Sequence, residues 1–470
     1  MAEAPSCPRY SIIVLSGPAG AQTRSMLPIA QELNRRDHRI TYITTQEFAE
    51  GNASGGVDVL VHEPRAVPGQ GAGGREERGG PEDGVRVEDT LDRAESIHAA
   101  FADDVPDLVL YEDSARITAR LLTHRWKRPA VEIFPSFAHG DFLERDEAAD
   151  PDAGCDAGAA SDPGTGSATG SDPASGPPSA TGPDPAFATG TGPASEPGSA
   201  SEMGSDAGVD AASGASDCVS GLSEGVRERL LCFVSPGEQA GLSPNDFCTR
   251  PEPLSIALLP REFQTDGHFF DSRVVFVGPC IPERRMDERW RPPGTGLPVV
   301  FFALDPELLD AGPEFVRDCI DAFAGRPLHV VIVADGNSEA VREMAGSSPH
   351  VEVHERVPRS VVLRCAAAFV CHSDHNSVME SLYFNTPLVA VPTSESERAV
   401  ADRVVELGLG VRISPGAAGP QALVDAVVAL VGDLETGCRV REFQRQARRA
   451  GGARRAADEI ERYLEWIYQP

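Results

Sequence analysis

Residues 367–391, AAFVCHSDHNSVMESLYFNTPLVAV, carry the clearest structural signal in the chain. Two short apolar runs flank a segment with the apolar spacing of a helix, which predicts a strand over 367–371, a helix over 376–384 and a strand over 388–391. A strand, a helix and a strand in succession form a βαβ unit, in which the two strands are parallel. The surrounding chain is therefore expected to have an α/β fold.

The same alternation continues on both sides of this unit. The first series has predicted strands over 11–16, 39–44, 57–61, 108–111 and 130–133, with predicted helices over 26–36 and 115–125. The second series adds strands over 299–304 and 329–334 and helices over 314–323 and 398–407 to the βαβ unit. Two separate series predict two Rossmann-like doubly wound domains that face a central cleft, with ligands at the carboxyl ends of the strands. We place an N-terminal domain over 1–278, a linker over 279–297, a C-terminal domain over 298–452, and a helix within 453–470 that returns to the first domain.

One segment, 146–224, differs in composition from the rest of the chain. It consists mainly of Asp, Gly, Ala, Ser, Pro and Thr, and no Lys or Arg occurs between Arg145 and Arg227. Such a segment cannot bury enough apolar surface to offset its loss of conformational entropy, so we expect it to be disordered. Residues 68–84, rich in Gly and charge, are expected to form a long surface loop.

Composition excludes several classes of partner. The 470 residues carry a net charge of −30, whereas nucleic acids and anionic membrane surfaces need a positive face. No apolar stretch approaches the roughly 18 residues of a membrane-spanning helix, and we see no secretory signal. The ten cysteines contain no C-x-x-C pair, which favours reduced thiols in the cytoplasm. His372 and His375 lack a third ligand, so no metal site is predicted.

Short segments in both halves carry a resemblance to a known family. They are 27–33 (LPIAQEL), 39–44 (RITYIT), 260–264 (PREFQ), 275–279 (VFVGP), 372–380 (HSDHNSVME), 387–392 (PLVAVP), 404–410 (VVELGLG) and 449–453 (RAGGA). With these segments the chain resembles the family-1 glycosyltransferases of GT-B fold, particularly the bacterial macrolide type. The resemblance implies transfer of a sugar from a nucleotide donor in the C-terminal domain to an acceptor in the N-terminal domain.

The resemblance also implies a donor site at the helix that follows residue 371. The family binds the pyrophosphate at a helix N-terminus, where free N–H groups favour an anion. His372, Asn376 and Ser377 match the positions that contact phosphate, and Glu380 matches the position that holds the ribose hydroxyls. Asp374 stands where the family usually has Gly, and its carboxylate is expected to repel a dianion or to cap its own helix.

Other departures concern the phosphates, the base and the sugar of the donor. Residues 303–306, ALDP, replace the family's Ser-Leu-Gly-Thr, which adds a carboxylate and removes an N–H donor. Arg356 occupies the position of the Trp that stacks on the nucleobase, and a guanidinium can also stack on a base. Ser396 and Arg398 stand where an acidic residue and Gln hold hexose hydroxyls. The guanidinium groups of Arg356, Arg359 and Arg398 offset part of the added negative charge.

The acceptor side departs from the family as well. Inverting transfer needs a base to take the proton of the acceptor hydroxyl. The family uses a His after the first strand, and Gln22 stands at that position with a carboxamide that has no useful basicity. Glu112, with Asp113 beside it, lies near the position of the acid that orients this His. Glu112 is therefore the alternative candidate for the base.

These departures lead to a hypothesis and an alternative. The hypothesis is a glycosyltransferase-like pseudoenzyme of antibiotic or other secondary metabolism, in which sugar transfer is lost or altered. It would bind a small lipophilic metabolite or assist another biosynthetic protein. The alternative is an active inverting O-glycosyltransferase that moves a sugar from a UDP or dTDP donor to a macrolide or polyketide. No cofactor is expected besides this co-substrate, and a different reaction in the same cleft and a homodimer stay open.

Overall fold

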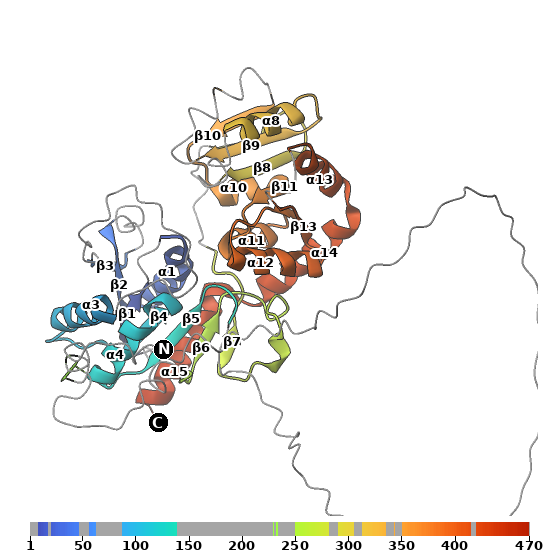
Figure 1. Cartoon of the computed structure of the whole chain (residues 1–470). Helices are drawn as coiled ribbons and strands as arrows, with labels where there is room; N and C mark the ends of the chain where they lie inside the picture. Colours follow the sequence, from blue (N-terminus) through green and yellow to red (C-terminus); the bar gives the residue numbers. More distant parts are fainter. Residues whose placement is uncertain are drawn as a thin grey trace, which may run out of the picture. The chain divides into compact units, whose positions relative to one another are not determined.

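The computed structural model describes residues 8–16, 20–46, 56–62, 87–138, 229, 232–233, 250–281, 290–304, 313–334, 343, 350–414 and 420–469. These residues form two parallel β-sheets with their covering helices, and both sheets belong to one compact unit of the chain (Figure 1). The predicted disordered segment 146–224, the predicted loop 68–84, and residues 305–306 lie outside the described residues. None of the described helices is long and apolar enough to cross a membrane.

The first sheet has seven strands in the order β3-β2-β1-β4-β5-β6-β7. Their bounds are β1 Ser11–Leu15, β2 Arg39–Thr44, β3 Asp58–Val61, β4 Leu108–Glu112, β5 Ala130–Phe134, β6 Ser255–Ala257 and β7 Val274–Phe276. All neighbouring strands pair in parallel; Ile12 of β1, for example, lies opposite Ile40 on one side and Leu108 on the other. Every residue of β4 and β5 is buried, as in a sheet covered on both faces.

Helices cover both faces of this sheet. Helices α1 (Gly20–Arg35) and α15 (Gly452–Tyr468) share one apolar cluster with the sheet, and α3 (Val87–Ala100) and α4 (Arg116–Trp126) share another. In α1 the buried residues Met26, Ile29 and Leu33 recur at helical spacing, so one side of the helix faces the sheet. A short 3-10 helix, η1 (Asp113–Ala115), joins β4 to α4, and η2 (Gly267–Phe269) precedes β7.

The second sheet has six parallel strands in the order β10-β9-β8-β11-β12-β13. Their bounds are β8 Val299–Leu304, β9 His329–Ala334, β10 Val351–His354, β11 Ala366–Cys371, β12 Leu388–Ala390 and β13 Gly410–Arg412. Helices α8 (Pro313–Phe323) and α13 (Pro420–Gly432) pack on it in one cluster. The remaining helices are α10 (Arg359–Leu363), α11 (His375–Tyr383), α12 (Glu395–Glu406) and α14 (Leu434–Arg449).

The structure confirms two parallel α/β sheets and most of the predicted strands. Helix α1 begins earlier than the predicted helix 26–36 and contains Pro28 in its interior. Strands β6, β7 and β13 were not predicted, although β12, which also has three residues, was predicted from the apolar run 388–391. Strand β10 and helices α3, α13 and α14 were also missed. The domain and linker boundaries stay predictions.

The last helix is held on α1 by ion pairs as well as by apolar packing. Nη1 of Arg36 lies 2.7 Å from Oδ1 of Asp458 and 2.6 Å from Oε2 of Glu461. The buried His38 contacts Glu461 through Nε2 at 3.0 Å, while its Nδ1 accepts a hydrogen bond from the N–H of Tyr10. These contacts hold α15 against α1, and both helices share one apolar cluster with the first sheet.

The junction between α14 and α15 packs tightly against the end of β7. The N–H of Gly452 donates to the carbonyl of Val277 at 2.7 Å. Gly278 has φ of +75°, and a Cβ there would lie 2.8 Å from the carbonyl oxygen of Ala447. Only glycine fits such a conformation at so close an approach. Two family-resembling segments, 275–279 and 449–453, thus form one packing contact.

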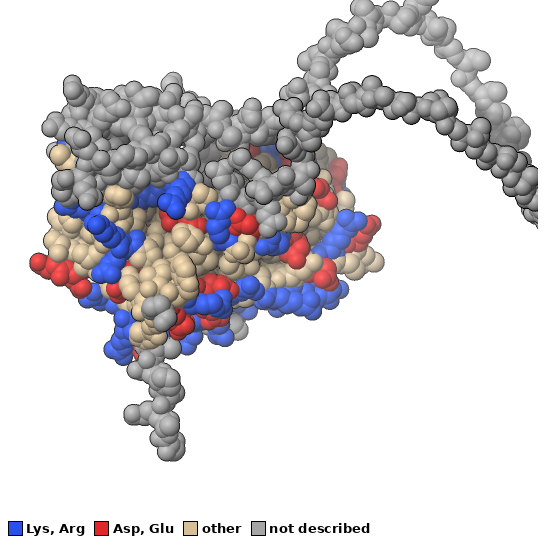
Figure 2. Space-filling model, turned by 90° about the horizontal axis from the view of Figure 1, so that it is seen from below, with Lys and Arg blue, Asp and Glu red and all other residues tan. Residues whose placement is uncertain are grey.

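Charged side chains of both signs lie side by side on the face of the molecule shown in Figure 2. Among the described residues, several charged side chains pair within one helix, such as Arg439 with Glu435 at 2.5 Å. Exposed pairs of this kind contribute little to stability, about 0–1 kcal/mol each. Their effect is to break up the single-sign surface that a nucleic acid would need.

Burial on α15 gives a stability prediction. Ile460 is fully buried, so Ile460→Ala should lower the free energy of unfolding by about 2–5 kcal/mol through lost contacts and a cavity. Trp466 is on the same helix but 71% exposed, and it is the matched control. Trp466→Ala should change the free energy of unfolding by about 0.5 kcal/mol or less. Urea unfolding of both variants checks this. Equal losses of stability in the two variants would show that α15 does not pack on the first sheet as described.

Candidate functional site

Chain order reverses at one place in each sheet. In the first sheet β1 lies between β2 and β4, and in the second β8 lies between β9 and β11. Doubly wound sheets bind ligands at the carboxyl ends of the strands beside such a reversal. Glu112 ends β4, and His372 directly follows β11. The fold therefore places the predicted residues of each half at the ligand-binding edge of its sheet.

Glu112 lies in a buried polar group at the edge of the first sheet. Its side chain is almost fully buried, and Oε1 accepts a hydrogen bond from Oγ of Ser114 at 3.0 Å. Tyr42 of β2 is also buried. Its burial, and then the negative charge of Glu112, raise the pKa of the Tyr42 phenol well above its ordinary value. Tyr42 is therefore neutral near Glu112, and the carboxylate is the basic group of the pair.

Gln22 lies in the first turn of α1, which follows β1 at the same edge. Its side chain lies outside what the structure describes. Asp113, the neighbour of Glu112, forms an ion pair with Arg116 at 2.7 Å, and Arg116 in turn pairs with Glu132. Asp113 thus belongs to a structural ion-pair network at the start of α4.

Asp374 caps the helix that was predicted to bind phosphate. It is the N-cap of α11, and its Oδ1 accepts a hydrogen bond from the N–H of Ser377 at 3.0 Å. Burial opposes its charge, but the charges of Arg359 and His372 and the hydrogen bond from Ser377 outweigh burial and lower the pKa of Asp374. An anionic side chain therefore already occupies this helix N-terminus.

His372 lies between two carboxylates. Its Nε2 is 3.3 Å from Oδ2 of Asp374 and 3.7 Å from Oε1 of Glu397. Glu397 forms a capping box with Ser394 at the start of α12 and accepts hydrogen bonds from Thr393. Sequence reasoning missed Glu397, although the S-x-x-E spacing of a capping box was a signal that could have found it.

Arg359 joins two of the predicted donor-binding residues. Its Nη1 donates to Oγ of Ser377 at 2.7 Å and lies 3.8 Å from Oε2 of Glu380. Its guanidinium thus supplies positive charge beside Asp374, where the family resemblance places a pyrophosphate. Arg359 offsets the added carboxylate in the way that the sequence suggested.

The other predicted donor residues are more exposed. Asn376 is half-buried in the first turn of α11, and Arg356 is exposed in the loop after β10. Ser396 and Arg398 are exposed in the first turn of α12, and Oγ of Ser396 is 3.2 Å from Oγ of Ser394. Their side chains are accessible to a ligand at the starts of α11 and α12.

His375 serves packing rather than metal binding. Its ring is edge-on to Phe137 and Phe263, with centroids 5.9 Å away in both cases. Burial lowers the pKa of His375 to about 4, so the ring is neutral at ordinary pH. Within the described part of the chain, no group of three or more His, Cys, Asp and Glu side chains could hold a metal ion.

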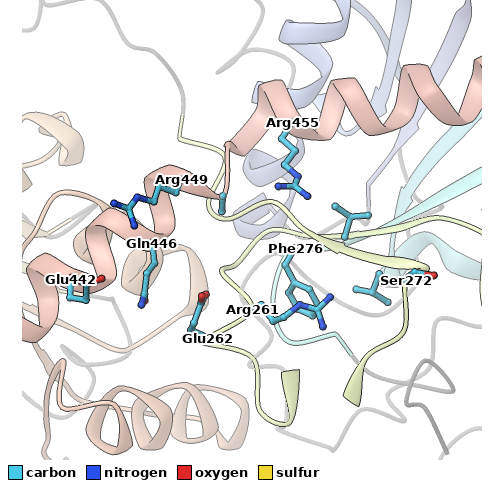
Figure 3. Close-up of a pocket in the computed structure, with 11 residues that line it drawn as sticks. Arg261, Glu262, Ser272, Phe276, Glu442, Gln446, Arg449 and Arg455 are labelled. Atoms are coloured by element: carbon cyan, nitrogen blue, oxygen red, sulfur yellow. The ribbon is translucent and has the colours of Figure 1, made fainter. Parts of the chain in front are cut away.

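A groove of about 610 Å³ lies elsewhere, between β7, the loop before it and the α14–α15 junction. Arg261, Phe276, Arg449 and Arg455 are among its lining residues (Figure 3). The guanidinium of Arg261 lies 4.5 Å from the ring centroid of Phe276 and donates to the carbonyl of Gly267. None of the predicted site residues lines this groove, so it is separate from the candidate site.

Comparison with known proteins supports the family resemblance along the whole chain. The NDP-glycosyltransferase YjiC of Bacillus licheniformis is 37% identical over 46% of this chain, an alignment that spans only about half (54%) of that relative. The oleandomycin glycosyltransferase of Streptomyces antibioticus is 28% identical, over 96% of this chain and 90% of that protein. The structure of CalG4, the calicheamicin glycosyltransferase, matches with a TM-score of 0.70 and 26% identity, covering 98% of this chain and all of that one.

The chain is similar to bacterial natural-product NDP-glycosyltransferases over nearly its whole length. Its two parallel sheets are the Rossmann-like halves of the GT-B glycosyltransferase fold. No protein-family model matches the chain. The relatives give no support to the pseudoenzyme hypothesis, because they are described as transferases.

The charge on Asp374 gives a prediction for stability against pH. Asp374→Ala should lower the free energy of unfolding by about 1 kcal/mol at pH 7, because the N-cap is lost, and Asp374→Asn should lower it less, because Asn also caps. The folded-state pKa of Asp374 is lowered, so its charge stabilises the fold above the ordinary Asp pKa of about 3.9 and loses this effect as pH falls through the lowered value.

Urea unfolding of the wild type and the Asp374→Asn variant between pH 7 and pH 3 measures this effect. The difference between the two should shrink below about pH 4. A difference that stays constant over this range would show that the carboxylate charge adds no stability.

Proposed function

We propose that this chain is an active glycosyltransferase that moves a sugar from a UDP or dTDP donor to a hydroxyl of a lipophilic natural product, such as a macrolide or polyketide. The observation that carries the proposal is the match to CalG4 and to the oleandomycin glycosyltransferase across both halves of the chain. Both halves of such an enzyme are needed, because one binds the donor and the other the acceptor. The candidate residues at the edges of both sheets support it.

On the donor side, the proposal assigns the phosphates to the start of α11. Arg359 and the Oγ of Ser377, 2.7 Å apart, would hold the diphosphate together with His372. A guanidinium suits this task, since its planar N–H groups bind phosphate oxygens in pairs. Asp374 would remain the cap of the helix, so side chains rather than free N–H groups of α11 supply the positive charge.

On the acceptor side, the proposal assigns the base to Glu112. A buried carboxylate beside a neutral Tyr42 can accept the proton of a hydroxyl placed at this edge. Gln22 begins α1 at the same edge, and its carboxamide would orient the hydroxyl without taking the proton. As the acceptor oxygen bonds to the anomeric carbon, the nucleoside diphosphate leaves with the electron pair.

The hypothesis of lost or altered transfer keeps one observation in its favour. Asp374 is an anion at the place where the donor phosphates would bind, and the pKa of its carboxyl is lowered, so it stays charged. In that case the scaffold would bind a metabolite or assist another biosynthetic protein. Assays of donor binding and of transfer separate the two functions.

Donor binding is the first test. Titration calorimetry with UDP and dTDP should give a Kd below about 1 mM, equivalent to −4.1 kcal/mol. Arg359→Ala should weaken binding at least about tenfold, since a charge-assisted bond to phosphate is lost, and Asp374→Asn should tighten it by removing a like charge. Arg364→Ala is the matched control, because Arg364 ends the same short helix but stacks on Phe384. No binding by the wild type would favour the hypothesis of lost transfer.

Transfer itself tests Glu112. With a panel of UDP- and dTDP-sugars and macrolide acceptors, Glu112→Gln should lower kcat about 10²–10⁴-fold, because the base becomes an amide. Gln22→His should raise kcat by adding a second base. Glu132→Gln, the same change at a buried carboxylate of the neighbouring strand, is the control. Undiminished turnover by Glu112→Gln would exclude Glu112 as the base.

A further inference from the structure

Arg93 is a half-buried arginine of α3 to which sequence reasoning gave no role. Its Nη2 donates to the carbonyl oxygen of Ser16 at 2.6 Å. Its Nε is buried and, among the described residues, has no hydrogen-bond partner. Burial lowers the pKa of the Arg93 guanidinium, and the negative charge of Glu112 opposes this effect. A buried charge with an unpaired N–H destabilises a fold, so its presence calls for a compensating role.

The position of Arg93 suggests that role. Ser16 is the residue after β1, and Glu112 ends the neighbouring strand β4. Arg93 therefore binds the end of β1, and the parallel pairing of β1 with β4 places Glu112 at the neighbouring strand end. Both strand ends belong to the edge where the acceptor hydroxyl would react.

We infer that Arg93 is a positioning residue of the transfer reaction, which fixes the end of β1 and places a positive charge beside Glu112, the proposed base. This inference rests on the proposed function. In the part of the chain that the structure describes, Tyr42 of β2 and Ser114 of η1 also lie near Glu112. Both are neutral near pH 7, since the pKa of Tyr42 is raised, so neither replaces the positive charge of Arg93.

The pH dependence of kcat/KM tests the inference. The acidic limb reports the pKa of the base in the free enzyme. In Arg93→Gln it should move up by at least about one pH unit, because an opposite charge near a carboxyl lowers its pKa by about 1–3 units. Arg93→Lys keeps the positive charge but lacks the planar guanidinium that binds the carbonyl of Ser16. The acidic limb of its pH profile should therefore stay in place while kcat/KM falls.

Arg128→Gln is the matched control. Arg128 is half-buried in the same half of the chain, donates to the hydroxyl of Tyr468 at 3.3 Å, and precedes β5 at the opposite edge of the sheet. Arg128→Gln should leave the pH profile of kcat/KM unchanged. A loss of rate in Arg93→Gln without movement of the acidic limb would mean a merely structural role and overturn the inference.

A double-mutant cycle separates this inference from the proposed function. Urea unfolding of Arg93→Gln, Glu112→Gln and the double variant should show a coupling of at least about fivefold in the unfolding equilibrium constant. If the wild type transfers no sugar, the proposed function fails, but this coupling still supports the pair of Arg93 and Glu112. If the effects of the two substitutions on unfolding are additive, Arg93 and Glu112 do not interact, and the inference is overturned whether or not the protein transfers a sugar.

Discussion

One contact between the two halves holds the donor residues in place. Arg403 of α12 donates to the carbonyls of Phe263 and Glu262 at 2.9 and 2.7 Å, and the side chain of Gln264 binds both the N–H and the carbonyl of Ala138. The fully buried ring of Phe263 lies edge-on to His375 at the start of α11. Buried main-chain groups need partners, and here side chains provide them. The loop of 260–264 thus ties both α11 and α12 to the end of β5, and the geometry of the donor residues follows.

The same two helices impose an electrostatic constraint on any donor. A free helix N-terminus attracts an anion, but α11 is capped by Asp374 and α12 by the capping box of Ser394 and Glu397. The N–H groups that these caps use are not available to phosphate. Arg359 is the compensating cation, and it is bound to Ser377 rather than to a carboxylate at hydrogen-bond distance. If the chain binds a nucleotide donor as proposed, the affinity would depend on this guanidinium more than on the helix dipole.

The sequence was sufficient for the parts of the molecule that show in local patterns. The apolar runs of most strands and the helices between them predicted two parallel sheets, whereas β6, β7, β10 and β13 were missed. Capping by Asp374 was anticipated from its place before a helix. Arg93 was not, because its partner Ser16 lies 77 residues away and only the folded sheet brings the two together.

This difference explains why the acceptor side was harder to interpret than the donor side. Four of the predicted donor residues lie within 372–380, directly after β11, so substitutions in that segment are visible in the sequence. On the acceptor side, the ends of β1 and β4 and the helix α3 each contribute one group, and a Gln at the position of the family's His looks like a loss when taken alone. Burial changes that conclusion, since a carboxylate enclosed with a neutral phenol and a buried guanidinium is an environment suited to proton transfer. Under the proposed function, the amide of Gln22 would leave proton transfer to Glu112 of the neighbouring strand.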